Sequence, residues 1–499
     1  MTPTSGGGPA TTPNTVRAPR PGQVRRPALA AHPGPARPPA RRALAPASSP
    51  ERAPSPTRRA ARAPSRRLAD LFLALAGLGF GATLGLAVTA ETRGALVAPG
   101  GVAMALGRLA GLTGAYLMLV MVVLIARMPF LERAVGQDRL LRWHRRIGPW
   151  PISLIAAHGA LITLGYAQAA RTGVLHQLWI LIDSYPNILA AVAAFGLLVA
   201  AGVTSFRLAR RRMRYESWWA VHLYTYLALA LAFAHQIGTG ASFVGHPLTR
   251  IVWSVAWACT AGLVLVFRIA LPVWRSMRHR LRVVQVHEEG PGVVSVVCEG
   301  RHLERLAVSG GQFFQWRFLR RGMWWQAHPY SISAMPRPPY LRFTIKALGD
   351  QSRSLAAIEP GTRVAIEGPY GTFTHHVRET NGVVLIGAGV GVTPLRALLE
   401  DLPESVDAVV ILRGSKPADL VLRDEMSALV DERGGRLHEV VGQRGDVRFD
   451  ARAIRHLVPD IASRDVYVCG PDGFTASVVA AAERLRVPAE RLHTEAFSF

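Results

Sequence analysis

The sequence has 499 residues, of which 49% are hydrophobic, and it carries a formal net charge of +25. About half of this excess lies in residues 1–67, which hold thirteen arginines and one acidic residue, Glu51. A basic chain can bind nucleic acid, but a basic tail followed by basic loops of a membrane protein explains this distribution better, so we expect no nucleic-acid partner. The three cysteines, Cys259, Cys298 and Cys469, stand in separate segments, which excludes a disulfide framework, a cysteine zinc site and an iron–sulfur cluster.

Residues 1–67 consist mainly of Pro, Ala, Arg, Ser and Gly and have almost no large apolar side chains. This composition cannot bury a core, and it predicts a disordered tail. The first long apolar run begins only at Leu68, which is too late for a secretory signal peptide.

The chain from Leu68 to Leu271 has the pattern of a membrane domain. Six apolar stretches each approach the ~20 residues that cross the hydrocarbon core of a bilayer. They are 68–90, 101–128, 147–167, 187–206, 218–237 and 249–271. Buried core helices of a soluble protein are the weaker alternative, so the pattern predicts a bundle of six transmembrane helices.

Arginines between these stretches predict the orientation of the chain. Two loops are rich in arginine, the one between the second and third stretches and the one between the fourth and fifth, whereas the other loops hold about one arginine each. Arginine-rich loops stay in the cytoplasm. We therefore expect a multi-pass protein of the cell membrane, with its N-terminus and everything after the sixth helix in the cytoplasm. The arginines of the first rich loop are Arg127, Arg133, Arg139, Arg142, Arg145 and Arg146.

The pattern changes after His279. Short alternating runs punctuated by Gly and Pro predict an antiparallel β-barrel, and from Gly382 buried strands alternate with helical segments, which predicts a parallel sheet in an α/β domain. The expected domains are a tail (1–67), a six-helix membrane domain (68–275), a β-barrel (276–378) and an α/β nucleotide-binding domain (379–499). The expected strands of the barrel are 282–287, 292–299, 312–318, 341–346 and 362–367.

Four histidines fall within or at the ends of the predicted membrane helices, where ionisable side chains are costly and usually functional. His144 and His158 lie fourteen residues apart on the third helix, and His222 and His235 lie thirteen apart on the fifth. Both helices run outward from the cytoplasm, so His144 should meet His222 and His158 should meet His235. Two facing imidazoles are what a six-coordinate haem needs, and the spacing predicts two stacked b-type haems. Structural histidines are the alternative.

The thirteen-residue spacing does not fit an ideal helix. Thirteen residues are about 3.6 turns, which turns His235 away from the face of His222, whereas fourteen residues keep His144 and His158 on one face. Either the fifth helix is distorted or the side-chain rotamers compensate.

A glycine-rich segment, Gly387-Ala388-Gly389-Val390-Gly391-Val392-Thr393-Pro394, follows a buried strand and opens a predicted helix. Glycines let the backbone approach a pyrophosphate, and the helix N-terminus favours its negative charge. Thr393 as N-cap and Pro394 at the first helical position fit this start. Cys469-Gly470-Pro471 ends a later strand, at the edge of the sheet where ligands bind.

These motifs resemble the ferredoxin–NADP reductase superfamily, in its ferric reductase and NADPH oxidase branch. His328-Pro329-Tyr330-Ser331-Ile332-Ser333 is similar to its flavin motif and Gly349-Asp350-Gln351-Ser352 to its flavin pyrophosphate motif. The glycine segment and Cys469-Gly470-Pro471 resemble its nicotinamide-dinucleotide motifs, and the histidine pairs resemble its haem domain. The resemblance covers residues 68–499.

The resemblance implies FAD and NADPH or NADH as cofactors, and roles for individual residues. Tyr330 would pack on the flavin, Ser331 would approach the ring nitrogen that receives hydride, and His328 would contact ribityl or phosphate. The other implied flavin ligands are Pro329, Ser333, Lys346, Gly349, Gln351 and Ser352, and the implied nucleotide ligands are Gly387, Gly389, Gly391, Thr393, Pro394, Cys469, Gly470 and Pro471.

The end of the chain is Glu495-Ala496-Phe497-Ser498-Phe499. Relatives in this superfamily end in an aromatic residue that stacks on the flavin, which implies Phe497 in that role, with Phe499 as the alternative. Ser331, Cys469 and Phe497 would then line the place of hydride transfer. Arg413, after the second strand of the parallel sheet, could meet a 2′-phosphate, which favours NADPH over NADH.

The sequence therefore predicts a transmembrane oxidoreductase that moves electrons from cytosolic NAD(P)H through FAD and two haems to an extracytoplasmic acceptor. A ferric chelate and dioxygen are both candidate acceptors, and the oligomeric state is open. One alternative is electron delivery to a partner protein or a quinone. Another is a membrane-anchored nucleotide-binding regulator without electron flow, against which the four histidines argue.

Overall fold

The computed structural model describes residues 66–213, 215–347, 355, 357–443, 445–447 and 449–496. All but the last two residues of the predicted tail, 1–67, lie outside this described part. So do Gly349, Gln351 and Ser352 of the predicted pyrophosphate motif, and Phe497 and Phe499 at the chain end.

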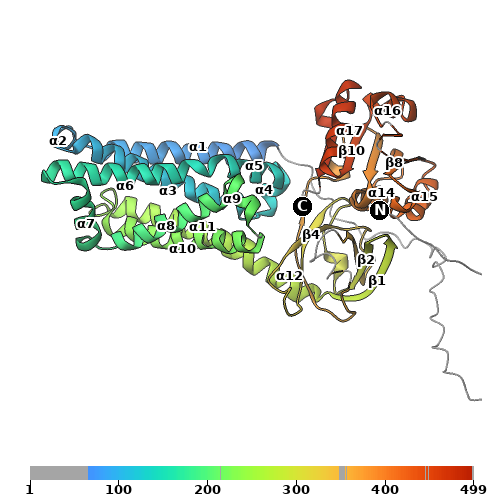
Figure 1. Cartoon of the computed structure of the whole chain (residues 1–499), viewed down its shortest axis with the longest axis horizontal. Helices are drawn as coiled ribbons and strands as arrows, with labels where there is room; N and C mark the ends of the chain where they lie inside the picture. Colours follow the sequence, from blue (N-terminus) through green and yellow to red (C-terminus); the bar gives the residue numbers. More distant parts are fainter. Residues whose placement is uncertain are drawn as a thin grey trace, which may run out of the picture. The chain divides into compact units, whose positions relative to one another are not determined.

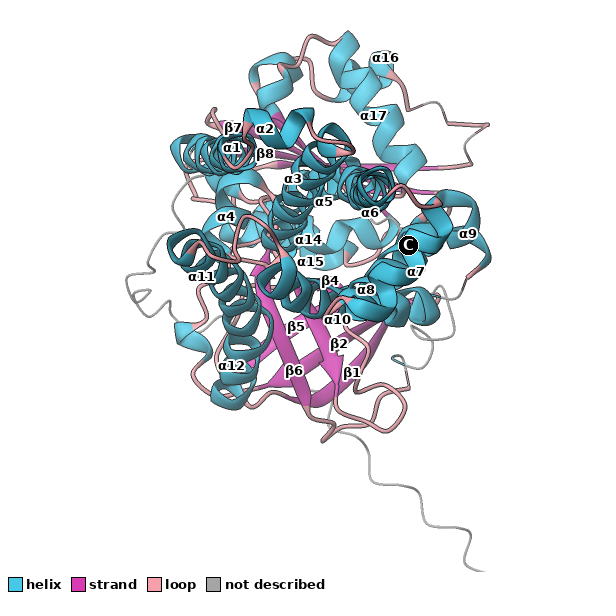
Figure 2. Cartoon of the chain, turned by 90° about the vertical axis from the view of Figure 1, so that its left-hand side faces the viewer, coloured by secondary structure: helices cyan, strands magenta, loops and turns pink. Residues whose placement is uncertain are grey.

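Six helices in the described part are long and apolar enough to cross a membrane: Arg67–Thr89, Gly101–Ile125, Arg139–Ala170, Ile188–Ser205, Ser217–Thr239 and Pro247–His279. They coincide with the six predicted stretches, which confirms the membrane domain. Their cores are helices α1 (Arg66–Thr89), α3 (Gly101–Ile125), α6 (Pro149–Ala170), α8 (Ile188–Ser205), α10 (Tyr215–Thr239) and α11 (Pro247–Val264). These helices lie side by side (Figure 1) and are seen nearly end on in Figure 2.

The third and sixth spans are composite helices. Helix α5 (Gln137–Ile147) meets α6 at Gly148, whose own backbone is helical, so the two form one nearly continuous rod. After α11 the chain passes through a π-helical segment, η1 (Leu265–Ala270), into α12 (Leu271–His279). Shorter helices connect the spans: α2 (Arg93–Val97), α4 (Pro129–Val135), α7 (Val174–Ser184) and α9 (Arg207–Arg212).

The assignment of Arg139, Arg142, Arg145 and Arg146 to a loop is wrong, because they lie on helix α5. Hydropathy marks only the apolar part of a helix that extends beyond the membrane. The charged turns of α5 extend the third span towards its N-terminus, so the helix begins well before its apolar part does.

Two three-stranded antiparallel sheets follow the membrane domain and confirm the predicted antiparallel fold. One has the order β1-β2-β5 and the other β4-β3-β6, and bridges from Ile332 to Phe343 and from Arg282 to Arg363 join them. Trp316, Phe314 and Phe343 fill the core between them. The strands are β1 (Arg282–Gly290), β2 (Val293–Glu299), β3 (Phe313–Phe318), β4 (His328–Ser331), β5 (Tyr340–Lys346) and β6 (Val364–Tyr370).

A five-stranded parallel sheet of order β11-β10-β7-β8-β9 forms the last domain, which confirms the predicted α/β fold. Alternate residues of a strand face opposite sides of a sheet, so Val383 and Leu385 of β7 pack on one side and Val384 and Ile386 on the other. Helices α14 (Val392–Asp401) and α15 (Arg423–Asp431) cover the first face, and α16 (Ala451–Leu457) and α17 (Asp472–Arg484) cover the second. The strands are β7 (Gly382–Ala388), β8 (Asp407–Gly414), β9 (Arg436–Val441), β10 (Asp465–Gly470) and β11 (Leu492–Ala496).

Candidate functional site

The four membrane histidines form two facing pairs. The ring centres of His144 on α5 and His222 on α10 lie 6.2 Å apart, and those of His158 on α6 and His235 on α10 lie 6.4 Å apart. The pairs are those expected from helices that run in the same direction, and the two distances are nearly equal.

All four rings are oriented by a contact at the Nδ1 atom. Nδ1 of His144 lies 3.2 Å from the Met121 carbonyl oxygen, and Nδ1 of His158 lies 2.8 Å from that of Gly107. Nδ1 of His235 lies 2.9 Å from Oγ1 of Thr239, and Nδ1 of His222 lies 3.4 Å from Oγ of Ser205. A hydrogen bond at one ring nitrogen leaves the other, Nε2, as the ligand atom, which is the usual arrangement of a metal-binding histidine.

The spacing of each pair fits a metal held between two imidazoles. Metal–imidazole bonds of about 2 Å, with about 1.1 Å from each bonded nitrogen to its ring centre, put the ring centres about 6 Å apart. In the described part of the chain, no group of three or more His, Cys, Asp or Glu side chains is close enough to hold a bare ion. A metal held by one pair would have two protein ligands only, and its remaining ligands would have to come from a bound group.

Glycines allow the helices around His158 to approach closely. A Cβ atom on Gly111 of α3 would lie 2.5 Å from Nδ1 of His158, and one on Gly165 of α6 would lie 2.9 Å from the Gly100 carbonyl oxygen. Small residues at such positions let two membrane helices pack backbone to backbone. The close contact of α3 with α6 explains how the Gly107 carbonyl reaches the His158 ring.

Helix α10 runs without interruption from Tyr215 to Thr239. A break in the helix is therefore not what brings both His222 and His235 to their partners across a thirteen-residue spacing. Both histidines of α10 nevertheless face a partner, with ring planes inclined by 66° in one pair and 60° in the other. Trp218 stacks on His222 with ring centres 5.2 Å apart and holds that ring from the side.

The predicted flavin motif lies on β4. Tyr330 stacks almost parallel between His328 and Phe343, with ring planes 10° and 3° apart. Its carbonyl oxygen accepts a hydrogen bond from Nε1 of Trp316 on β3. Burial raises the pKa of Tyr330 and lowers that of His328, so the phenol and the imidazole are both neutral near pH 7.

Several predicted ligands present buried polar atoms that have no partner within the described chain. They are Nε2 of His328, Oγ of Ser331, Oγ of Ser333 and Oγ1 of Thr393. Because a buried polar group without a partner is costly, these atoms are the ones that a bound ligand would satisfy. The residues present therefore fit a flavin and a dinucleotide at the motifs where the sequence expects them.

The glycine segment and the Cys469 motif meet at the edge of the parallel sheet. A Cβ atom on Gly391 would lie 2.4 Å from the carbonyl oxygen of Cys469 and 2.7 Å from Cα of Gly470, so only glycine permits this approach. Gly389 has a φ of 56°, in the left-handed region. Pro471 caps helix α17, and burial raises the pKa of the Cys469 thiol, which keeps it neutral.

The predicted N-cap role of Thr393 is wrong. Helix α14 begins at Val392 with Gly391 at its N-cap position, because the residues before it, Gly389–Gly391, already form a turn of 3-10 helix. Thr393 therefore lies inside the first helical turn with Pro394, and its hydroxyl is not used by the helix start.

The remaining predicted ligands have different surroundings. Gly387 is the penultimate residue of strand β7, where a Cβ would lie 2.9 Å from Leu395, and the side chain of Lys346 at the end of β5 is exposed. Arg413 at the end of β8 is buried, and its guanidinium donates to the carbonyl oxygens of Gly414 and Val440. A 2′-phosphate would have to compete with these carbonyls for Arg413.

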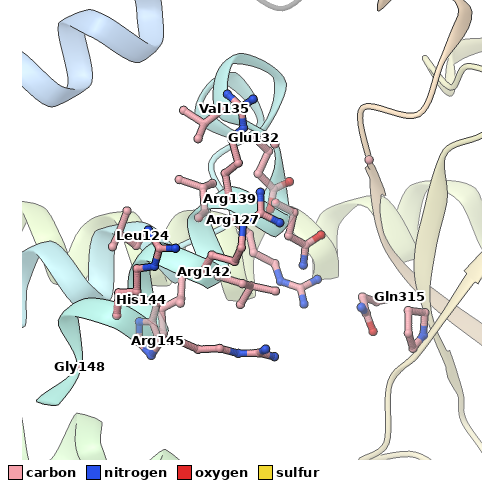
Figure 3. A pocket seen from close by; sticks show the side chains of 18 of the residues that line it. Leu124, Arg127, Glu132, Val135, Arg139, Arg142, His144, Arg145, Gly148 and Gln315 are labelled. Carbon is pink, nitrogen blue, oxygen red and sulfur yellow. The ribbon is translucent and has the colours of Figure 1, made fainter. Parts of the chain in front are cut away.

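One connected cavity of about 3190 Å³ joins the His144–His222 pair to the predicted flavin motif. It is lined by both of these histidines, by Tyr330 and Ser331, and by Thr393. Figure 3 shows the arginines of α5 beside His144, with Gln315 of β3 across the cavity. The cavity is several times larger than a pocket of about 1,000 Å³ for one small ligand, so it has room for more than one group.

A cluster of charged residues joins strand β6 to the membrane helices. Oε1 of Glu367 accepts a hydrogen bond from the Tyr370 hydroxyl at 2.8 Å and lies 3.5 Å from Nη1 of Arg127 and 3.4 Å from Nη1 of Arg268. The buried carboxyl of Glu132 on α4 belongs to the same cluster. We call Arg127, Glu132, Arg268, Glu367 and Tyr370 the junction cluster.

Several residues of this site were not predicted from the sequence. Ser205 orients a histidine ring and Glu367 joins the domains through contacts between distant segments. Trp218 and Thr239 could have been found, since each stands four residues from a histidine on the same face of α10.

Comparisons with known proteins give the class of protein. A family model described as "Ferric reductase like transmembrane component" matches residues 110–233, one described as "FAD-binding domain" matches residues 281–374, and one described as "Oxidoreductase NAD-binding domain" matches residues 385–480. The chain thus combines a ferric reductase-like transmembrane component with an FAD-binding domain and an oxidoreductase NAD-binding domain. This confirms the resemblance seen in its motifs.

Individual relatives match parts of the chain. A flavohemoprotein of Deinococcus radiodurans is 31% identical over 251 residues, which cover 45% of this chain and 60% of that protein. NADPH oxidase 1 of Mus musculus is 32% identical over 80 residues, 15% of this chain and 14% of that protein. The FAD/NAD-binding domain of a nitric oxide dioxygenase from Vibrio cholerae is 22% identical, covers 44% of this chain and 99% of its own, and has a TM-score of 0.37.

Proposed function

We propose that this chain is a transmembrane oxidoreductase that takes hydride from cytosolic NAD(P)H and delivers single electrons to an acceptor on the opposite side of the membrane. The observation that carries the proposal is the two histidine pairs with ring centres 6.2 and 6.4 Å apart, each ring oriented through its Nδ1 atom. Their alignment along the same two helical rods supports a path through the bilayer.

The cofactors would be FAD, NADPH or NADH, and two b-type haems. His144 with His222 would hold one haem, and His158 with His235 the other. When bound, these groups would supply the conversion of a two-electron hydride into single electrons and the transfer of those electrons through the membrane domain.

The protein's own residues would bind and orient the flavin and the nucleotide. Tyr330 offers a flat face held by Phe343, and the hydroxyls of Ser331 and Thr393 offer hydrogen bonds inside a buried cavity. Ser331, Cys469 and Phe497 are the residues we propose at the place of hydride transfer, where no proton has to be moved by a side chain. The other cofactor ligands that we propose are the flavin and nucleotide ligands named from the motifs in the sequence analysis.

The same proposal includes the arrangement of the chain in the cell. Residues 68–275 would form the membrane domain, 276–378 the FAD domain and 379–499 the NAD(P) domain, after a tail of residues 1–67. The arginines on α5 and on α9 support an orientation in the cell membrane that puts the N-terminus and both soluble domains in the cytoplasm.

The acceptor would be a ferric chelate or dioxygen. We propose to test the function in sealed proteoliposomes of the haem- and flavin-loaded protein, with ferric citrate enclosed or with oxygen alone, and NADPH or NADH added outside. Oxidation of external NAD(P)H that depends on an enclosed acceptor is the expected result. If external NAD(P)H is oxidised equally fast without enclosed ferric citrate, transmembrane transfer to ferric citrate is refuted. Consumption of oxygen during the reaction would identify dioxygen as the acceptor.

A further inference from the structure

Exposed large apolar side chains are rare in the described residues that follow the membrane domain. Among the described residues that follow His279, only Leu319, Trp324 and Tyr340 belong to this class, with 49%, 60% and 49% of their surface exposed. Two of the three lie in one loop, Leu319–Ala327, which connects β3 to β4 of the FAD domain. We call this segment the 319–327 loop.

The 319–327 loop combines apolar and basic side chains. Its sequence is Leu-Arg-Arg-Gly-Met-Trp-Trp-Gln-Ala, and it contains no acidic residue. Arg320 and Arg321 are exposed, and neither forms an ion pair within the described part of the chain. Aromatic side chains beside unpaired arginines are typical of protein segments at the interface between water and lipid headgroups.

The loop is held in a defined shape. The amides of Met323 and Trp324 donate to the Arg320 carbonyl oxygen at 3.0 and 3.1 Å, and Gly322 takes a φ of 84° that closes the turn. Met323 packs on the core of the FAD domain. Trp324 is therefore presented outward by a folded turn and is not left exposed by a lack of structure.

A contact with a membrane helix gives the position of the loop. Trp325 packs against Trp219, with ring centres 6.4 Å apart. Trp219 is the third residue of the membrane span Ser217–Thr239, so it lies at the end of that span. The loop is thus next to the level where the hydrocarbon core begins.

We propose that the 319–327 loop is a membrane-contact site, in which Leu319 and Trp324 enter the headgroup region and Arg320 and Arg321 bind anionic lipid headgroups. The loop continues the lipid-facing surface of the helices onto the FAD domain. The proposal depends on the membrane location of α10, but not on electron transfer or on any bound cofactor.

The test measures the distance of labelled positions from lipid. Cys298 and Cys469 are buried and Cys259 is exposed on α11, so a Cys259→Ala background leaves no exposed native cysteine in the described chain. Trp324→Cys, Leu319→Cys and the matched control Tyr340→Cys would each carry a fluorescent label, in full-length protein in nanodiscs that contain phosphatidylglycerol and a headgroup-nitroxide lipid. The protein with its native Cys259 labelled, in discs with an acyl-chain nitroxide, reports whether the helices lie in the membrane.

We expect label fluorescence at positions 319 and 324 to be quenched several-fold more than at position 340. Arg320→Gln combined with Arg321→Gln should reduce the quenching at position 324 in anionic discs to the level seen in discs of phosphatidylcholine alone. Quenching at 319 and 324 equal to that at 340, while Cys259 is quenched, would overturn the proposal and leave the membrane domain intact. Equal quenching in anionic and neutral discs would overturn the binding of anionic headgroups by Arg320 and Arg321. An unquenched label on Cys259 would overturn the premise that the helices lie in the membrane.

Discussion

At the residue scale, the four proposed haem-ligand histidines can be recognised in the sequence more readily than the atoms that orient their rings. Four histidines at matched heights on two helices are visible in the sequence, because bilayer hydrocarbon disfavours ionisable groups that have no function. The atoms that orient the rings are less visible. The Gly107 and Met121 carbonyls are backbone groups, which no residue type marks.

The hydroxyl of Thr239 orients the ring of His235, and removing it tests whether this contact helps to hold the haem. Oγ1 of Thr239 lies 2.9 Å from Nδ1 of His235. Thr239→Val keeps the shape and removes the hydrogen bond, and loss of such a partner typically lowers the affinity for the bound metal group 10–100-fold. We expect the haem content to fall from two per chain towards one, measured by the absorbance of the pyridine haemochrome.

Thr225→Val is the matched control, since the Thr225 hydroxyl donates to the backbone carbonyl of His222 and does not touch a ring. An unchanged haem content in both variants would show that Thr239 has no part in holding the group.

At the scale of elements, length and hydropathy were enough to predict all six spans, the antiparallel sheet fold and the parallel sheet, since bilayer thickness and strand alternation leave direct patterns. Strand β4 was missed because it has four residues and includes Pro329, which is untypical of a strand. The extension of α6 into α5 was missed because the polar turns lie outside the hydrocarbon. The pairing of α10 with both α5 and α6 depends on helix crossing, which a sequence pattern does not contain.

The close packing of α3 on α6 predicts a specific effect of adding one methyl group. A Cβ atom on Gly111 would overlap the ring of His158, whereas Gly77 on α1 has nothing within 4 Å of the same position. Gly111→Ala should displace His158 and remove about one haem per chain, and Gly77→Ala should leave both. Haem-to-protein ratios of the two purified variants measure this, and equal ratios would contradict the proposed role of Gly111.

At the scale of the whole molecule, the junction cluster connects the FAD domain to the membrane domain at Arg127, at Glu132 of α4 and at Arg268 of η1. The Arg275 guanidinium donates to the Gly368 carbonyl oxygen, and the amide of Ile366 donates to Ser276, so strand β6 is tied to α12 along several residues. Motifs along the chain predicted the domains, but not this joint, whose partners are about a hundred residues or more apart.

Removing the charge of Glu367 should weaken this joint. Glu367→Gln takes the charge from the partly buried carboxylate that faces both Arg127 and Arg268, which costs less than the about 3–5 kcal/mol for breaking a fully buried ion pair. In stopped-flow experiments, flavin reduction by NADPH should keep its wild-type rate, and the subsequent haem reduction should slow at least tenfold. The control is Glu359→Gln, an exposed residue of the same domain; equal haem reduction in both variants would contradict a positioning role.

Glu132 makes the stability of the junction depend on pH. Burial raises its pKa to about 7, so the folded protein binds this proton more tightly than the unfolded chain does. The resulting stabilisation is present below about pH 4 and is lost as the pH rises through 7, a difference of about 3 kcal/mol. Glu132→Gln should remove this dependence.

The thermal unfolding midpoint of Glu132→Gln, relative to the wild type, should therefore rise between pH 5 and pH 8. A constant difference between the two proteins over this range would mean that Glu132 does not change its protonation there.

The most direct test of the account is the reduction of the His158→Ala variant, loaded with flavin and haem, by NADPH in the absence of oxygen. The wild type should hold two haems per chain and show reduced b-type absorption bands from both. The variant should keep flavin reduction and one reducible haem, held by His144 and His222, and should lose reduction of an external acceptor. Acceptor reduction by the variant at the wild-type rate, or no reduced haem bands in the wild type, would contradict electron transfer through the two histidine pairs.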